Sequence, residues 1–154
     1  MTAGALTRKP WDGKRPLTAA VLVDVDGTLA GVYRRGRRPL RPSAPAALEL
    51  LSRRAPVFLW SVAGAENAVR LLIEHPAVVP WVSGCWGKQD FPLGRVGRAY
   101  CIDDQRVDAA VAAAHAVFLV DCYQGGHDSG ALMEAAEALV RRLAQESGPS
   151  GLLK

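Results

Sequence analysis

The sequence lacks the features that would place it in a membrane or export it. None of its apolar runs approaches the roughly 20 residues that are needed to cross a bilayer. Residues 1–16, MTAGALTRKPWDGKRP, carry charges and prolines but not the apolar core of a secretory signal. We therefore expect a cytoplasmic protein with no membrane partner.

Cysteine is also scarce. The three cysteines are an odd number, they form no CxxC pair, and no histidine lies at zinc-finger spacing from them. This pattern indicates neither a disulfide framework nor a structural zinc site. Reduced thiols in or near the core are expected at Cys85, Cys101 and Cys122.

What is present suits one compact domain. The chain has 154 residues, of which 49% are hydrophobic and 22% are charged, enough apolar residues for one core and too few charges for wholesale disorder. Both ends are rich in Gly, Pro, Ser or charge, which is typical of loose segments. The expected organisation is a flexible leader at 1–18, a domain at 19–146 and a flexible tail at 147–154.

Apolar runs alternate with helical patterns along the domain. Four buried strands are predicted at 19–24, 56–61, 98–103 and 116–121. Helices are predicted at 44–54, 65–75, 107–115 and 129–146. Such alternation is typical of parallel strands joined by crossover helices, so an α/β fold is expected.

Polar side chains stand where three of the predicted strands end. Asp24 closes the first strand, Ser61 the second, and Asp103 with Asp104 the third. Asp and Ser are common in the turns after strands, which explains each of them singly. Because ligands of open parallel sheets bind beyond the carboxyl ends of the strands, their repetition predicts one shared site.

Four segments resemble, in order, the motifs of the haloacid dehalogenase (HAD) superfamily of phosphoryl-transfer enzymes. They are DVDGTLAG at 24–31, VFLWSVAG at 57–64, GKQDFP at 87–92 and YCIDDQRVD at 100–108. The first matches the DxDGT motif, and the similarity covers about residues 19–121. The resemblance implies a Rossmann-like, HAD-type three-layer fold with a parallel sheet of about five strands.

The resemblance also assigns roles, and the chemistry of the side chains agrees with them. A carboxylate can attack phosphorus and form an aspartyl-phosphate, the role implied for Asp24. Asp26 would give a proton to the leaving oxygen and later take one from water. Ser61 and Lys88 complete the implied catalytic set, because they would bind and neutralise the transferring phosphoryl group. Backbone groups implied in phosphoryl binding belong to Gly27, Thr28, Val62 and Ala63.

The cation implied by the resemblance is Mg²⁺, which prefers oxygen ligands. Its implied ligands are Asp24, the backbone carbonyl of Asp26, and Asp103 or Asp104. The sequence leaves open which of the latter two binds and whether Asp108 contributes. It also leaves Arg95 and Arg98 as alternatives to Lys88.

The insertions that would carry a cap domain in this family are short here, so a capless protein is expected. Five arginines lie in RRGRRPLR at 34–41, beside the predicted site. They favour anionic ligands, or they form a solvated basic loop.

The expected function is Mg²⁺-dependent phosphomonoester hydrolysis of a nucleotide, a sugar phosphate or a phosphorylated macromolecule. The alternatives are a non-catalytic scaffold that binds a phosphorylated partner and a phosphatase for nucleic-acid ends; an open site also permits a homo-oligomer.

Overall fold

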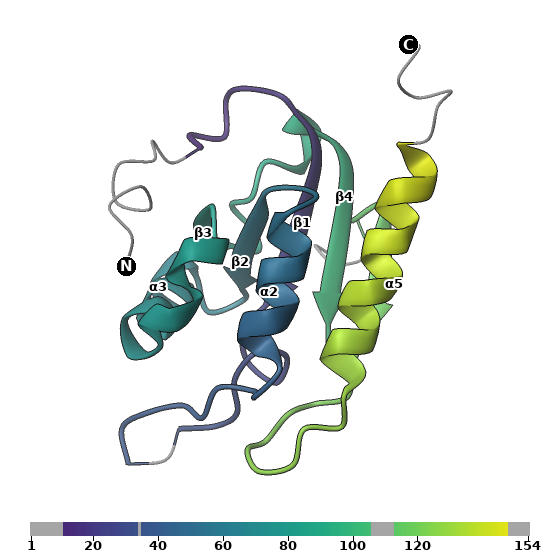
Figure 1. Cartoon of the computed structure of the whole chain (residues 1–154). Helices are drawn as coiled ribbons and strands as arrows, with labels where there is room; N and C mark the ends of the chain where they lie inside the picture. The colour runs from purple at the N-terminus through teal and green to yellow at the C-terminus, as the bar shows by residue number, and fades with distance from the viewer. Residues whose placement is uncertain (1–10, 34, 106–112, 148–154) are drawn as a thin grey trace.

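A five-stranded, all-parallel sheet in the order β3-β2-β1-β4-β5 forms the centre of the protein (Figure 1). The computed structural model describes residues 11–33, 35–105 and 113–147. The strands are β1 (Leu17–Asp24), β2 (Val57–Ser61), β3 (Gly84–Gly87), β4 (Val96–Asp103) and β5 (Ala116–Leu119). The expected α/β, Rossmann-like fold with about five parallel strands is confirmed.

Three α-helices contribute to one continuous core against the sheet. They are α2 (Ala44–Ser52), α3 (Ala65–Glu74) and α5 (Ala131–Glu146), with short 3₁₀ helices η1 (Pro76–Trp81) and η2 (Leu93–Arg95). Buried leucines of all three pack with the valines of β1, and α2 lies beside α5 in front of the sheet (Figure 1). Among the described residues, none of the helices has the length and apolar character that crossing a membrane requires.

An aromatic cluster lies in a second core that contains the alternate residues of the strands. The Trp11 ring lies 5.2 Å from that of Phe58 and 5.6 Å from that of Phe91, measured between centroids. Trp60 and Trp86 also contact Phe91. Trp11 belongs to the segment expected as a leader (1–18), and β1 begins two residues before the expected start at position 19. Residues 1–10 and 148–154 lie outside the described residues.

One strand was not predicted. The four residues of β3, GCWG, include two glycines and show neither the length nor the alternation of a predictable strand. Pairing with β2 nevertheless sets Gly87 beside Ser61, and the Lys88 amide donates to the Ser61 carbonyl at 2.9 Å. The missed strand therefore delivers Lys88 to the predicted site.

The predicted helix at 107–115 falls mostly outside the described residues, which omit 106–112 and with them Asp108. The described residues 113–115 form a turn that leads into β5 rather than a helix. The other predicted helices and strands are present, with ends that differ by one or two residues.

Arg41 joins two loops at the edge where the strands end. Its side chain is fully buried, and Nη2 lies 2.7 Å from Oδ1 of Asp121 while Nε lies 3.5 Å from Oδ1 of Asp128. It also donates to the carbonyl of Thr28. The flap, defined here as residues 29–43 between β1 and α2, is thus anchored to the loop after β5, and this part of the arginine run is not a solvated basic loop.

Replacing Arg41 by Ala should destabilise the fold, because it leaves two carboxylates and a buried carbonyl without their shared donor. We expect a loss of about 2–3 kcal/mol in the free energy of unfolding, measured by urea denaturation. Arg53→Ala is the matched control, because Arg53 forms an exposed pair with Glu49 whose loss costs about 0.5 kcal/mol or less. Equal effects of the two substitutions would contradict the structural role of Arg41.

Candidate active site

The strand arrows point to one edge of the sheet (Figure 1), and the predicted site residues at the strand ends, Asp24, Ser61 and Asp103, lie at that edge. Ser61 is one residue beyond the partner of Asp24 on β2, and Asp103 is one residue beyond the last partner of β1 on β4. A hollow of about 310 Å³ opens there. It is lined by Asp24, Asp26, Ser61, Val62, Ala63, Lys88, Asp103, Asp104 and Gln105.

The turn after β1 is built by Gly27 and Thr28. Gly27 has φ +83°, and a side chain there would collide with the carboxylate of Asp104. Thr28 is fully buried, and its hydroxyl donates to Oδ2 of Asp24 at 3.0 Å. The Thr28 side chain therefore orients Asp24 and does not line the hollow, whereas Gly27 allows the backbone to pass close to Asp104.

Lys88 lies between two buried carboxylates. Its Nζ is 3.1 Å from Oδ1 of Asp24 and 2.7 Å from Oδ2 of Asp103. All three side chains are less than 10% exposed. Of the two alternatives that the sequence left open, Arg98 pairs with Glu146 and Arg95 is exposed on η2, so neither lines the hollow.

One cation shared by two buried carboxylates changes their protonation. Burial and repulsion from Asp103 raise the pKa of Asp24 to about 8, although Lys88 opposes the shift. Burial likewise raises the pKa of Asp103 against the hydrogen bond from Lys88. Burial alone would lower the pKa of Lys88, but the two carboxylates outweigh it and hold that pKa above its usual value. With no other cation bound, the pair of acids retains one proton near neutral pH.

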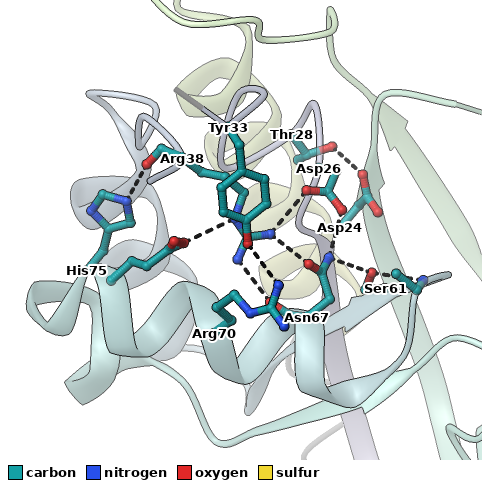
Figure 2. A network of polar contacts seen from close by, with 11 residues as sticks. Asp24, Asp26, Thr28, Tyr33, Arg38, Ser61, Asn67, Arg70 and His75 are labelled. Atoms are coloured by element: carbon teal, nitrogen blue, oxygen red, sulfur yellow. Dashed lines mark hydrogen bonds and ion pairs between the residues drawn. The ribbon is translucent and has the colours of Figure 1, made fainter. Parts of the chain in front are cut away.

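A polar network connects Ser61 to Asp26 through a residue that the sequence analysis missed (Figure 2). Nδ2 of Asn67 donates to Oγ of Ser61 at 2.9 Å and to Oδ2 of Asp26 at 2.7 Å. The Ser61 hydroxyl oxygen also accepts from the amide of Ala63 at 3.1 Å. Asn67 stands in the first turn of α3, so its only signal was a polar side chain shortly after Ser61.

The sequence placed Arg38 in the arginine run but did not mark it as a residue of the site. Arg38 is fully buried, and it donates to Oδ1 of Asp26 at 3.1 Å, to Glu74 at 3.2 Å and to both side-chain and backbone oxygens of Asn67 at 3.0 Å (Figure 2). Nothing in the arginine run distinguishes it from its neighbours. The half-exposed carboxylate of Asp26 is therefore bound on both oxygens, by Arg38 at Oδ1 and by Asn67 at Oδ2.

Three carboxylates could hold a divalent cation. Oxygens of Asp24, Asp103 and Asp104 all lie within 4.8 Å of one another beside the hollow. A set of oxygen donors at this spacing fits Mg²⁺, which keeps some of its waters and takes few protein ligands. Both members of the acidic pair contribute to the cluster, and the carboxylate of Asp26 does not.

No protein-family model matches this chain, and no curated protein matches it significantly in sequence. The resemblance to the HAD superfamily therefore stays a prediction that rests on the four motifs.

Lys88→Met should destabilise the protein more at high pH than at low pH. A carboxyl whose pKa is raised in the folded state keeps a proton that the unfolded chain loses, so its contribution to stability falls as pH rises from about 4 toward its folded pKa. Without Lys88, we expect the contributions of both Asp24 and Asp103 to fall in this way as pH rises. We expect a loss of about 1–2 kcal/mol at pH 5 and about 3–4 kcal/mol at pH 8, from urea unfolding in EDTA.

Lys14→Met is the matched control for this experiment, since Lys14 is exposed and lies outside the hollow. It should change stability little at either pH. A Lys88→Met effect that does not grow with pH would show that the two carboxylates do not depend on the lysine charge.

Proposed function

We propose that this protein is a Mg²⁺-dependent phosphomonoester hydrolase of the HAD type, with no cap domain, that works through an aspartyl-phosphate on Asp24. One observation carries the proposal: two acids separated by one residue share a hollow but differ in burial and in hydrogen-bond partners. Asp24 is buried against Lys88, and Asp26 is half-exposed between Arg38 and Asn67. Two carboxyls in different environments suit two different catalytic roles.

Asp24 is the proposed nucleophile. The hydrogen bond from Thr28 to Oδ2 and the contact of Lys88 with Oδ1 fix the orientation of its carboxylate. One of its oxygens forms the bond to phosphorus while the bond from phosphorus to the ester oxygen breaks. When bound by Asp24, Asp103 and Asp104, Mg²⁺ would offset the repulsion between carboxylate and phosphate.

Ser61 and the backbone after it form the proposed binding site for the phosphoryl oxygens. Val62 and Ala63 line the hollow, and Val62 is 57% exposed. The hydroxyl oxygen of Ser61 already accepts hydrogen bonds from Asn67 and Ala63, so its own proton is available to an anionic oxygen. Lys88 supplies positive charge at the inner wall of the hollow.

Asp26 is the proposed general acid and base. It gives its proton to the leaving ester oxygen and, once the alcohol has left, takes one from the water that attacks the aspartyl-phosphate. Its contacts with Arg38 and Asn67 fix its position on the rim of the hollow. A scaffold that only binds a phosphorylated partner has no use for this second, separately positioned acid.

Phosphate release from p-nitrophenyl phosphate, nucleotides, sugar phosphates and phosphorylated oligonucleotides, with and without EDTA, tests the proposal directly. Turnover of none of them would favour the non-catalytic scaffold. The nucleic-acid alternative has less support than the arginine run suggested, because Arg38 and Arg41 are buried in ion pairs.

Asp24→Asn and Asp26→Asn should separate the two roles. An amide at position 24 neither attacks phosphorus well nor carries charge, so phosphoenzyme and turnover should both be lost. An amide at position 26 cannot transfer a proton, so turnover should fall by roughly 10²- to 10⁴-fold while p-nitrophenyl phosphate still phosphorylates Asp24. Intact-protein mass spectrometry after rapid acid quenching, with steady-state kinetics, measures both. A phosphoenzyme in Asp24→Asn, or normal turnover in Asp26→Asn, would reverse the assignment.

Binding of Mg²⁺ should release a proton. With its pKa at about 8, Asp24 is mostly protonated at pH 7 and must ionise to bind the cation. We expect release of close to one proton at pH 7 and much less at pH 9, with affinity rising between them. Titration calorimetry in two buffers of different ionisation enthalpy measures the proton count. Equal proton release at both pH values would contradict a cation site at Asp24.

A further inference from the structure

A second hollow adjoins the first. Its volume is about 400 Å³, and Asp26, Asp104 and Gln105 line both hollows. The other walls come from the flap and from the loop after β5. They are formed by Gly31, Val32, Tyr33 and residues 122–124, and Gly27 also lines the hollow.

The walls of this hollow are built by close packing. A side chain at Gly31 would lie 2.7 Å from the backbone of Gln124, so flap and loop touch directly. The Tyr123 amide donates to the Gly27 carbonyl at 2.6 Å, and Tyr123 itself is buried. With Arg41 anchoring the same two segments, the hollow has a defined shape.

The described residues that line this hollow include exposed apolar side chains and no lysine or arginine. Val32 and Tyr33 line the hollow and are 63% and 44% exposed. The Tyr33 ring lies over the Arg38 guanidinium, whose carbon is 5.0 Å from the ring centroid (Figure 2). Arg38 is itself fully buried and bound to Asp26 and Glu74. Among the described lining residues, the charged groups are the acids Asp26 and Asp104.

We propose that this second hollow binds the alcohol that leaves during hydrolysis and selects an uncharged, ring-containing alcohol over an anionic one. The proposal rests on the proposed function. Because Asp26 gives its proton to the ester oxygen as the bond from phosphorus to that oxygen breaks, the alcohol must lie on the Asp26 side of the phosphoryl group. The Val32 and Tyr33 side chains offer apolar contact to a ring, and the described residues that line the hollow include no lysine or arginine that could bind a second phosphate or a carboxylate.

Binding of stable analogues tests the selection without turnover. The probes are benzylphosphonate, ethylphosphonate and phosphonoacetate, which share the phosphonate and differ in a ring, a small alkyl group and a negative charge. Titration calorimetry with Mg²⁺ present should give benzylphosphonate roughly tenfold tighter binding than ethylphosphonate, because the ring buries apolar area. Phosphonoacetate should bind more weakly than either.

Two variants assign the preference to the second hollow. Tyr33→Ala should remove most of the advantage of benzylphosphonate while ethylphosphonate binds as before. Gln124→Lys should raise the affinity for phosphonoacetate severalfold, because it adds a positive charge to an exposed wall residue. Ile73→Ala is the matched control: Ile73 is a 75% exposed apolar side chain on α3 and does not line the hollow.

The outcomes separate this proposal from the proposed function. Equal affinity for benzylphosphonate and ethylphosphonate, no binding of any probe, a ring preference that survives Tyr33→Ala, or a phosphonoacetate affinity that Gln124→Lys leaves unchanged would overturn the second hollow as the selective site. Hydrolysis of p-nitrophenyl phosphate together with equal affinities would reject the second hollow alone. A ring preference lost in Tyr33→Ala, with no hydrolysis of benzyl phosphate or p-nitrophenyl phosphate, would support the binding site and reject the hydrolase.

Discussion

Lys88 holds two buried carboxylates at the end of the sheet, and the candidate site depends on this interaction. Asp24 and Asp103 are the last residues of adjacent strands, so their side chains are forced together by the register of the sheet. Without a cation between them, burial and mutual repulsion would favour the protonated form of both carboxyls. Lys88 allows one negative charge to persist there, which a nucleophilic or metal-binding carboxylate needs.

The charge of the arginine-rich flap suggests anion binding, but two of its arginines instead form buried ion pairs within the protein. Arg38 and Arg41 are fully buried, and their guanidinium groups bind carboxylates and carbonyls from α3 and from the loop after β5. The cost of burying each charge is offset by several hydrogen bonds to charged partners. The flap is thereby fixed beside Asp26. Its exposed apolar residues, Val32 and Tyr33, line a second hollow.

Some parts of the site could be predicted because local sequence decides them. An apolar run ending in DVDGT predicts a buried strand, a tight turn and two acids at the turn. Other parts could not be predicted. The strand GCWG carries too little pattern to be recognised, and it exists because β2 offers it a pairing edge. Lys88 could not be chosen over Arg95 and Arg98 until that pairing placed it beside Asp24.

By itself, the sequence determined the alternation of strands and helices, the parallel α/β sheet and the polar strand ends that line the hollow, since periodicity and turn chemistry act over a few residues. Only the tertiary structure decided which long, charged side chains reach which partners. Arg38 meets Asp26 and Glu74 across 12 and 36 positions, and Arg41 meets Asp121 across 80. No local pattern encodes such pairs, because the choice among identical arginines is made by burial and by the carboxylates that the folded backbone brings within reach.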